Sequence, residues 1–361
     1  MKRIAIIGAG NSGCMTALVT YAACEERKLN CEILIYHDPK NNPIELVGQG
    51  TVLGPPKLIS HVLGINWYNN TIDATFKTGI LYEGWGKKRK KFFHPFTLQD
   101  IGIHFVPEKL SKAILNFKDF TVIEKKITNP EKEIDADIIF DCRGRNDRDK
   151  NKYDKLLSPI NSVLIGKKNK RNINLTYTRT VATPNGWTFV IPNTDSVSYG
   201  YLYNNKITSK ETATKDYLKR FNLSEVTHEL VFDNYIAKNI FTGERTVLQG
   251  NKCGFLEPLE ANSIDLYIKI CTCALDIIFK NESKIRINNY IRSEMKKIET
   301  FILWHYQFGS QYDTEFWEYA KSLPFKPDKE FIRIVENKIL NTKYGQWEGY
   351  AFKYWLDGVF S

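Results

Sequence analysis

Long apolar runs are missing from this sequence. No stretch approaches the roughly 18 consecutive apolar residues that a membrane-spanning helix needs. The run IAII, which follows Lys2 and Arg3, is too short for the core of a signal peptide and passes directly into a glycine-rich motif. Internal repeats and low-complexity segments are also missing, which argues against repeat architectures. We therefore expect a cytoplasmic protein without a membrane partner.

Metal-ligand spacing is missing too, although the chain has seven cysteines. Their number is odd, and no pair stands at the spacing of zinc ligands. Free, mostly buried thiols in a reducing cytosol fit this pattern best. We expect no metal site.

The distribution of charge argues against a nucleic-acid-binding protein. The chain has 51 Lys and Arg against 41 Asp and Glu, a net charge of +10. The basic residues are scattered except for GKKRKK at residues 86–91, and no zinc finger, RNA-recognition signature or basic helix accompanies that cluster. We expect a solvated loop there and no nucleic-acid partner. The positive charge would equally attract an anionic cofactor and small anions.

What is present is a folded chain with a dinucleotide-binding pattern at its start. Its 361 residues, 42% hydrophobic and 25% charged, allow two or three structural units. Gly8, Gly10 and Gly13 form a GxGxxG motif at a strand-to-helix turn. They permit the turn, let the backbone approach a pyrophosphate and pack the helix on the sheet. The surrounding pattern predicts a strand, a helix and a second strand, at residues 3–7, 12–28 and 33–36.

Residues after the glycine motif complete this site and indicate which dinucleotide it holds. Asp38 follows the second strand and is expected to reach the ribose hydroxyls, although His37 stands at the usual acidic position. Further along, ADIIFDCRGRND ends a strand at Asp141 and turns at Gly144, as flavoproteins do when a second loop returns to the cofactor. No hydride-transfer constellation of a nicotinamide enzyme is evident, so FAD is the better interpretation.

Much of the remaining chain predicts further strands and helices. Residues 39–56 are typical of a loop, with four prolines and three glycines. Residues 172–203 predict a sheet outside the dinucleotide unit. The tail after Pro324 combines a charged helix with an aromatic end that contains Trp347 and Trp355. Helices are predicted at residues 209–221, 263–280 and 289–307.

Motifs spread over most of the chain resemble those of the flavin-dependent tryptophan halogenase family, in the family's order. No single motif decides the matter, but so many in one order are hard to produce by chance. The resemblance covers roughly residues 3–317. Its motifs are VGQGT (47–51), DATFKTGILYEGW (73–85), FFHPF (92–96), ADIIFDCRGR (136–145), NGWTFVIP (185–192), SYGYLYNN (198–205), GFLEPLEANSI (254–264) and FILWHYQFGSQYDTEFW (301–317).

The resemblance implies an α/β protein with a Rossmann-like FAD-binding fold of the flavoprotein monooxygenase type, an added β-sheet layer and a small helical C-terminal region. We expect an FAD-binding module over residues 1–290, with an inserted substrate-side sheet at approximately 160–245. Residues 291–361 would form a helical substrate cover. The chain is shorter than typical family members, mostly near the C-terminus. A trimmed cover predicts a more open pocket and a broader range of aromatic substrates.

The resemblance also implies the reaction. Halogenases of this family use FADH2, O2 and halide to form hypohalous acid, which is too reactive to release and must pass through a dry tunnel. Lys77 matches the lysine that receives it, by hydrogen bonding or as a haloamine, before an electron-rich indole- or phenol-like ring is halogenated. Without the resemblance, Lys77 would be an ordinary surface lysine. Glu260 matches the acidic partner that stabilises the cationic intermediate or accepts the ring proton. The same residue would also suit a helix N-terminus.

The cofactor and halide contacts follow from two of these motifs. VGQGT resembles the family's flavin strap, so Val47 and Gly48 are expected to bind FAD. In EANS, which replaces the family's ESTG, the backbone amides of Asn262 and Ser263 take the place of those that cradle halide. Because the site's shape differs, our hypothesis is that bromide or iodide is accepted as readily as chloride.

Four aromatic positions are expected to form the substrate pocket. His94 and Phe96 correspond to rings that sandwich an indole in the family. Trp187 matches the first tryptophan of the motif GWxWxIP, which separates flavin from substrate, and Phe189 replaces the second. Core packing alone would also explain each of these residues.

Partners and alternatives complete the expectations. A separate flavin reductase would supply FADH2 transiently in free form, and a homo-oligomer stays open. An FAD-dependent aromatic monooxygenase would share the glycine motif and the Asp141 loop but would require neither Lys77 nor Trp187. The altered EANS segment and the short tail favour a third interpretation, a non-catalytic flavoprotein scaffold.

Overall fold

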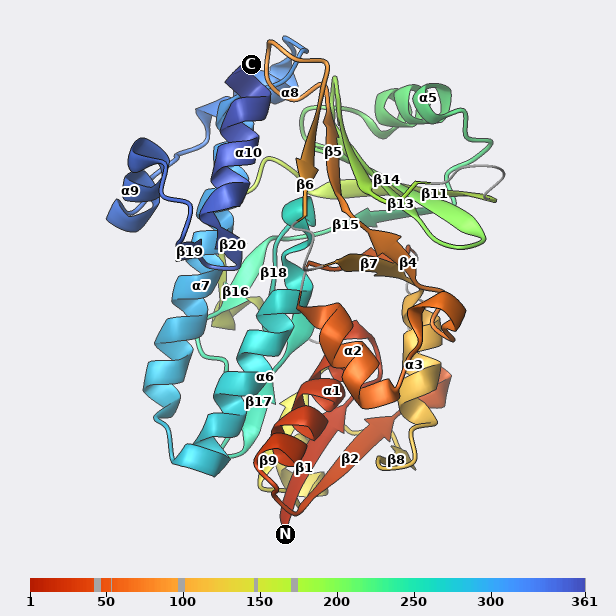
Figure 1. The fold of residues 1–361 in the computed structure, drawn as a ribbon, viewed down its shortest axis with the longest axis vertical. Helices are drawn as coiled ribbons and strands as arrows, with labels where there is room; N and C mark the ends of the chain where they lie inside the picture. The colour runs from red at the N-terminus through yellow and green to blue at the C-terminus, as the bar shows by residue number, and fades with distance from the viewer. Residues whose placement is uncertain (42–46, 53, 97–100, 146–148, 170–174, 361) are drawn as a thin grey trace.

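The computed structural model describes residues 1–41, 47–52, 54–96, 101–145, 149–169 and 175–360. Its first layer is a parallel sheet in the order β17-β9-β1-β2-β8, at the bottom of Figure 1. The C-terminal ends of these strands face the centre of the molecule. The strands are β1 (Lys2–Ile7), β2 (Cys31–His37), β8 (Thr121–Glu124), β9 (Ile138–Asp141) and β17 (Thr246–Leu248).

Both faces of this sheet are covered by protein. Ile4, Ala5 and Ile6 are consecutive in β1 and all fully buried, and consecutive side chains of a strand face opposite sides. Helix α1 lies against α6, where Thr20 and Cys271 are in contact, so α1 is buried almost all round. The helices of this layer are α1 (Asn11–Glu26), α2 (Pro55–Leu63), α3 (Pro107–Leu115), α4 (Pro130–Glu133) and α6 (Ser263–Lys280).

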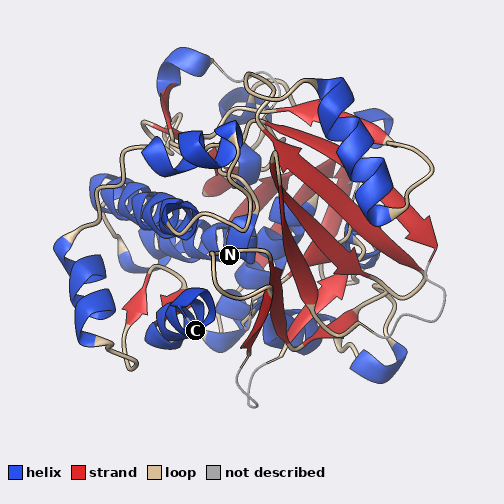
Figure 2. Ribbon diagram, turned by 90° about the horizontal axis from the view of Figure 1, so that it is seen from above, coloured by secondary structure: helices blue, strands red, loops and turns tan. Residues whose placement is uncertain are grey.

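A larger sheet forms the second layer, in the order β15-β11-β14-β13-β12-β5-β6. All its pairings are antiparallel except β12 with β5, which is parallel. Figure 2 shows it from above, with helices bundled along one side. The strands are β5 (Gly79–Glu83), β6 (Lys91–Pro95), β11 (Ser162–Asn169), β12 (Thr178–Thr183), β13 (Gly186–Pro192), β14 (Ser196–Tyr203) and β15 (His228–Val231).

Strand alternation assigns the two faces of this larger sheet. Trp187 and Phe189 of β13 belong to the main core, whereas Val190 belongs to a separate cluster beneath helix α5 (Lys210–Phe221). In that cluster the ring of Tyr201 in β14 contacts the ring of Tyr217 in α5. The face that carries Trp187 therefore looks toward the interior of the molecule.

Small sheets connect the two layers. One has the order β3-β7-β4, with β3 (Gln49–Gly50), β7 (Gly102–Phe105) and β4 (Thr75–Lys77). A second joins β10 (Tyr153–Lys155), β16 (Tyr235–Ala237) and β18 (Gly254–Phe255). The first of these sheets places residues near position 50 beside residues near position 77.

The C-terminal region is helical and folds back onto the large sheet (Figure 1). Helix α10 packs so closely on β6 that a Cβ on Gly358 would lie 2.1 Å from the ring of Phe92. A short hairpin precedes α10, formed by β19 (Lys343–Tyr344) and β20 (Trp347–Glu348). The helices are α7 (Lys284–Gln307), α8 (Glu315–Ser322), α9 (Lys329–Asn337) and α10 (Gly349–Phe360).

The predicted fold class is confirmed, and so are the strand–helix–strand opening, the strand before Asp141, the sheet within residues 172–203 and the later helices. Helix α7 starts five residues before the predicted position 289, at Lys284, because Ser283 caps it by accepting a hydrogen bond from the Arg286 amide. The prediction of a loop over residues 39–56 was partly wrong. Strand β3 and the start of α2 lie there, while residues 42–46 and 53 are outside the described residues. The predicted division at residue 290 stays a prediction.

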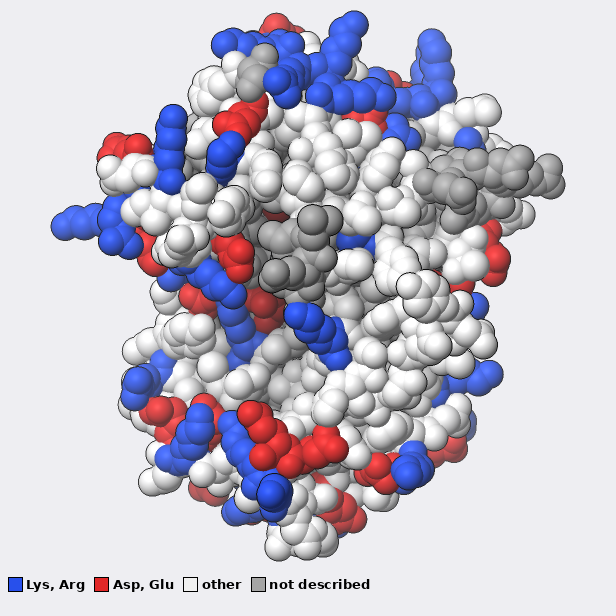
Figure 3. Space-filling view, viewed as in Figure 1, with Lys and Arg blue, Asp and Glu red and all other residues white. Residues whose placement is uncertain are grey.

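The expectation of free, mostly buried thiols is confirmed. All seven cysteines are free, and five are buried. Residues 87–90 of GKKRKK lie exposed in the turn between β5 and β6, whereas Gly86 is buried and Lys91 begins β6. Figure 3 shows basic side chains gathered at that end of the molecule. Over the described ranges, no helix is long and apolar enough to cross a membrane, and no group of three His, Cys, Asp or Glu could hold a metal ion.

The turn between β1 and α1 generates a stability prediction. A Cβ on Gly13 would lie 2.0 Å from the backbone oxygen of Gly8, which cannot move without disturbing the sheet. We expect Gly13→Ala to lower the free energy of unfolding of the flavin-free protein by about 1–3 kcal/mol, measured by urea unfolding. Gly54→Ala at the start of α2 is the matched control, since a Cβ there meets nothing within 4 Å. It should be neutral or slightly stabilising. Equal effects of the two substitutions would contradict the packing role of Gly13.

Candidate active site

The glycine motif forms a turn that leaves the N-terminus of α1 open. Gly8 has φ +103°, a conformation that favours glycine, and its Cβ position lies 3.1 Å from the oxygen of Cys142. Gly10 is extended and precedes the first residue of α1, Asn11. The first amide groups of an α-helix lack partners within the helix, so this turn presents donors to a phosphate.

Two side chains near this turn fit a bound dinucleotide. Among the described residues, Oδ1 of Asn11 is buried without a hydrogen-bond partner, as expected of an atom that awaits a ligand. Asp38 follows β2 and is half-buried, with its carboxylate accepting a hydrogen bond from the Lys40 amide. It follows directly after His37, the position at which this fold usually has an acid that accepts a hydrogen bond from a ribose hydroxyl. The residues present therefore fit FAD.

Asp141 shapes the second loop of the predicted cofactor site. Its carboxylate receives two hydrogen bonds from the guanidinium of Arg143, at 2.8 and 2.7 Å. Arg143 also donates to the oxygen of Ile127 at 2.6 Å. Gly144 follows with φ +77°. Because Arg143 occupies the Asp141 carboxylate, any contact with FAD would come from the backbone of this loop.

The strap, residues 47–51, leads directly to Lys77. Gly48 donates its amide to the hydroxyl of Ser198 at 3.1 Å, and a Cβ there would lie 2.1 Å from the side-chain oxygen of Asn193, which would have to move. The next small residue, Gly50, has its Cβ position 3.5 Å from Nζ of Lys77. Val47 packs against the main core. The structure thus brings the predicted flavin strap and the predicted catalytic lysine into contact.

Lys77 is buried, with 1% of its surface exposed, so it is not an ordinary surface lysine. Nζ donates to the backbone oxygen of Thr51 at 3.1 Å and lies 5.2 Å from the ring centroid of Phe96. Burial lowers the pKa of Lys77 to about 8, while the negative charge of Glu260 opposes that shift. Lys77 therefore gains or loses its proton close to neutral pH.

Glu260 is held in a strained backbone conformation within the short 3-10 helix Leu259–Ala261. It has φ +69°, and Ala261 follows with φ +50°, both rare for residues with a side chain. The carboxylate is buried: Oε2 accepts from Nε1 of Trp347 at 3.1 Å, and Oε1 lies 3.4 Å from Nε2 of His305. Helix α6 begins shortly after, at Ser263, so Glu260 also lies near a helix N-terminus, as the alternative interpretation expected.

A second buried carboxylate, Glu257, was missed by the sequence analysis. It is fully buried and accepts from Nε1 of Trp187 at 3.0 Å, from the hydroxyl of Tyr306 at 2.6 Å and from Ser158. Burial raises its pKa, although these hydrogen bonds oppose the shift. Glu257 and Glu260 are thus each bound by a tryptophan indole and each approached by a residue of α7.

The segment predicted to bind halide leads into α6. The side-chain amide of Asn262 donates hydrogen bonds to the backbone oxygens of Glu257 and Leu259, at 2.8 and 3.0 Å. Only its backbone amide is left to meet an anion. Ser263 is the first residue of α6, where amides lack helical partners. The side chain of Asn262 therefore stabilises the loop rather than a ligand.

The predicted pocket rings divide between two places. His94 lies 5.3 Å from Tyr354 of α10 and 6.4 Å from Phe96 between ring centroids. Burial lowers the pKa of His94 to about 3, and the nearby His305 and Lys77 add to the effect, so its imidazole is neutral. Trp187 lies deeper, at 1% exposure, with its ring 6.3 Å from Phe189.

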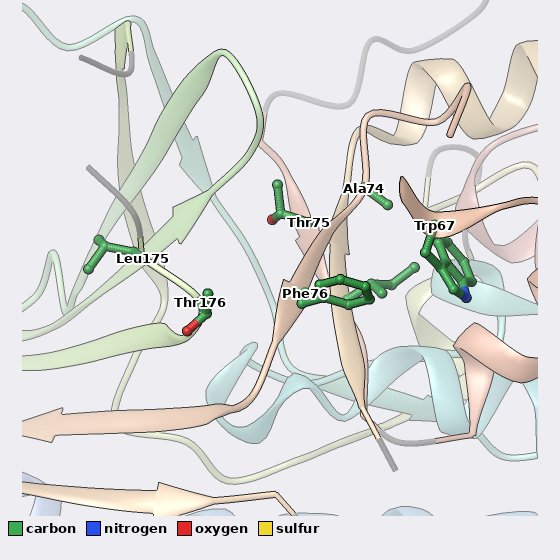
Figure 4. Close-up of a pocket in the computed structure, with 7 residues that line it drawn as sticks. Trp67, Ala74, Thr75, Phe76, Leu175 and Thr176 are labelled. Atoms are coloured by element: carbon green, nitrogen blue, oxygen red, sulfur yellow. The ribbon is translucent and has the colours of Figure 1, made fainter. Parts of the chain in front are cut away.

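The open pocket drawn in Figure 4 lies apart from the predicted site residues. It encloses about 410 Å³, and Phe76 points into it. Lys77 follows Phe76 in β4, so their side chains face opposite sides of the strand. The pocket is lined by Trp67, Ala74, Thr75, Phe76, Ile103, Leu175 and Thr176.

Comparison with known proteins identifies the family of the chain. The family model described as tryptophan halogenase matches residues 3–108 and 102–358. The chain is 23% identical to tryptophan 6-halogenase ThaL of Streptomyces albogriseolus over 80% of its length, and 24% identical to tryptophan 7-halogenase RebH of Lentzea aerocolonigenes over 64%. The matches span only 59% and 46% of those two relatives.

Solved structures show the same fold. The flavin-dependent halogenase BrvH from Brevundimonas sp. BAL3 superposes with a TM-score of 0.81 at 17% identity, over 99% of this chain and 89% of that one. A tryptophan halogenase from Shewanella frigidimarina NCIMB 400 gives a TM-score of 0.81 at 19% identity, over 99% and 88%. Because the family model covers nearly the whole sequence, the chain belongs to the tryptophan halogenase family.

Proposed function

We propose that this chain is a flavin-dependent halogenase that uses FADH2, O2 and halide. The hypohalous acid formed would pass through a tunnel to Lys77 and halogenate an electron-rich, indole- or phenol-like aromatic substrate. Bound FAD supplies the oxygen chemistry that oxidises the halide. A separate reductase would supply FADH2 in free form.

The observation that carries this proposal is the buried amine of Lys77, set between the flavin strap and the Glu260 carboxylate. Burying an ammonium is unfavourable, so a lysine in this position calls for a functional reason. An aromatic monooxygenase transfers oxygen directly from flavin to substrate and gains nothing from such a lysine. A non-catalytic scaffold gains nothing either. The burial of Lys77 therefore favours the halogenase over both alternatives.

Lys77 and Glu260 would divide the chemistry between them. The ammonium of Lys77 donates a hydrogen bond to the oxygen of hypohalous acid, and the halogen passes to a ring carbon as the oxygen–halogen bond breaks. The electron pair of that bond stays on oxygen, which leaves as water. Glu260 stabilises the positive ring and accepts the proton lost from the halogenated carbon. Hypohalous acid and the aromatic ring would thus give the halogenated ring and water, with the ring proton on Glu260 and a proton from Lys77 on the leaving oxygen.

Halide would be bound by the backbone amides of Asn262 and Ser263 at the start of α6. The positive end of an 18-residue helix favours an anion there, and Ala261 and Asn262 have φ values of opposite sign, as in anion-binding backbone turns. Acceptance of bromide or iodide as readily as chloride stays a prediction.

The substrate would lie between His94, Phe96 and Tyr354. Phe96 lies 5.2 Å from Nζ of Lys77, His94 contacts both Phe96 and Tyr354, and a neutral His94 can stack on an aromatic ring without adding charge. The names of the relatives point to tryptophan as one aromatic substrate of the family. A broader range of aromatic substrates stays a prediction for this chain.

The central test is replacement of Lys77 by Ala in reactions with FADH2, O2, bromide and a panel of indoles and phenols. We expect wild-type product to show the bromine isotope doublet in mass spectra, and Lys77→Ala to lose at least about a hundredfold of product while FADH2 oxidation continues. With equimolar chloride added to the same reaction, the ratio of chlorinated to brominated product measures the halide preference.

Lys112→Ala serves as the control, because Lys112 is exposed on α3. It should react as the wild type does. Hydroxylated product that persists in Lys77→Ala would indicate the monooxygenase instead. Absence of any modified product from the wild-type chain would indicate the scaffold.

Protonation of Lys77 also predicts how stability depends on pH. The folded chain releases this proton near pH 8, whereas an unfolded chain holds it to about pH 10.4. Between these values the unfolded state binds more protons, so the free energy of unfolding rises with pH. We expect Lys77→Met to be more stable than the wild type at pH 7, by up to about 3 kcal/mol. That difference should shrink as the pH rises from 8 to 10. Urea unfolding of both proteins, with Lys112→Met as control, measures it, and a constant difference would contradict a buried ammonium.

A further inference from the structure

Glu260 lies against a buried histidine, His305. Nε2 of His305 is 3.4 Å from Oε1 of Glu260, and the two side chains are 1% and 4% exposed. His305 belongs to α7, and its other ring nitrogen, Nδ1, lies 2.7 Å from the backbone oxygen of Phe301. The histidine is therefore fixed at both nitrogens.

The contact with Phe301 decides which nitrogen of His305 carries the hydrogen. A carbonyl oxygen only accepts hydrogen bonds, so Nδ1 must be the donor. In the neutral ring, Nε2 then presents a lone pair to the carboxylate of Glu260. Two acceptors face each other, and the contact becomes strongly favourable only when one proton lies between them. The pair thus has room for one additional proton.

Aromatic rings close this pair off from solvent. The ring of Trp355 lies 4.1 Å from that of His305, and the ring of Phe301 lies 4.8 Å from it. The indole of Trp347 stacks on Phe301 at 4.0 Å and holds the second oxygen of Glu260. A proton received by Glu260 consequently has a short route to His305 and none directly into bulk water.

Three ionisable groups of other elements face the pair. Lys77 of β4 interacts electrostatically with Glu260, and His94 of β6 and Glu257, ahead of the 3-10 helix, lie close enough to interact electrostatically with His305. His94 is neutral, and the carboxylate of Glu257 already accepts three hydrogen bonds. His305 instead places a basic nitrogen 3.4 Å from the Glu260 carboxylate.

We propose that His305 is the final acceptor of the substrate's ring proton, through Glu260. This rests on the proposed halogenase function. The carbon–hydrogen bond breaks, its electron pair restores the aromatic ring, and the proton moves from the Glu260 carboxylate to Nε2 of His305. An imidazolium–carboxylate pair results, and Glu260 is a carboxylate again. The leaving oxygen takes its proton from Lys77, and the proton on His305 restores that of Lys77 after turnover, so hypohalous acid and arene give haloarene and water.

Basicity gives the physical reason for a second acceptor. An imidazole nitrogen is a stronger base than a carboxylate oxygen, so a second acceptor favours loss of the ring proton. It also keeps Glu260 negative while the ring is positive. His305 thus acts through Glu260 as a positioning and proton-holding residue rather than by touching the substrate.

The test compares His305→Gln with Trp347→Phe. Glutamine can still donate a hydrogen bond to Glu260 but cannot accept the proton, whereas phenylalanine removes the other hydrogen bond to Glu260 and leaves His305 intact. Single-turnover halogenation is measured with an indole or phenol that the wild type accepts, with and without deuterium at the reacting carbon. We expect His305→Gln to be about 10–100-fold slower at unchanged KM, with a deuterium effect above about 2, because proton loss becomes limiting. The wild type and Trp347→Phe should show an effect near 1.

Wild-type rates in His305→Gln, or slow rates without a deuterium effect, would overturn the proposal. A second measurement needs no turnover. In protein labelled with 15N-histidine, NMR should show the hydrogen of neutral His305 on Nδ1, with signals assigned through variants of the other five of the six histidines. Hydrogen on Nε2 would overturn the proposal as well. If the wild type halogenates nothing, the proposed function fails, while the NMR result still decides whether the proton-holding pair exists.

Discussion

The burial of one positive charge is the constraint on which the rest of the site depends. Lys77 is 1% exposed, and a lysine in that position is stable only if neighbours replace the water it has lost. The oxygen of Thr51, the ring of Phe96 and the charge of Glu260 do so, each from a different part of the chain. The small sheet β3-β7-β4 holds the strap and the lysine together, and it joins the flavin layer to the large sheet.

The two carboxylates of the segment GFLEPLEANSI extend that network toward the C-terminus. Glu257 and Glu260 are met by consecutive residues of α7, Tyr306 and His305. The tail then folds back so that Trp347 reaches Glu260. Even in this short chain, the last helices therefore contribute directly to the site. Their hydrogen bonds also offset the strained backbone at Glu260, which few isolated segments would adopt.

Local signals made much of the fold predictable from the sequence. The glycine turn, the strand before Asp141 and the helix periodicities depend on neighbours within a few residues. Lys77 and Glu260 could be singled out because their motifs resemble those of a family, and the structure brings them within electrostatic reach of each other. The parallel pairing of β12 with β5 joins residues almost 100 positions apart, and no local pattern indicates such a partner.

Residues of the site that the sequence analysis missed depend in the same way on contacts between distant segments. His305 and Tyr306 stand in a predicted helix, whose periodicity does not indicate which groups these side chains contact. Glu257 lies in a quoted motif, and two glutamates three positions apart in an apolar segment could have signalled a second buried carboxylate. The sequence shows that the tail is rich in aromatic residues. Only the fold shows that Trp347 donates a hydrogen bond to Glu260 and that Trp355 packs on His305.

The most direct test of the account is to ask where the oxidant arrives first. A methionine sulfur takes up oxygen from hypohalous acid, so Lys77→Met places a trap at the buried position, while Met1 at 77% exposure samples oxidant released into solution. Peptide mass spectrometry after turnover with FADH2, O2 and bromide should find sulfoxide at position 77 before it appears at Met1, and none without bromide. Oxidation of Met1 with position 77 untouched would contradict delivery of the oxidant to this site.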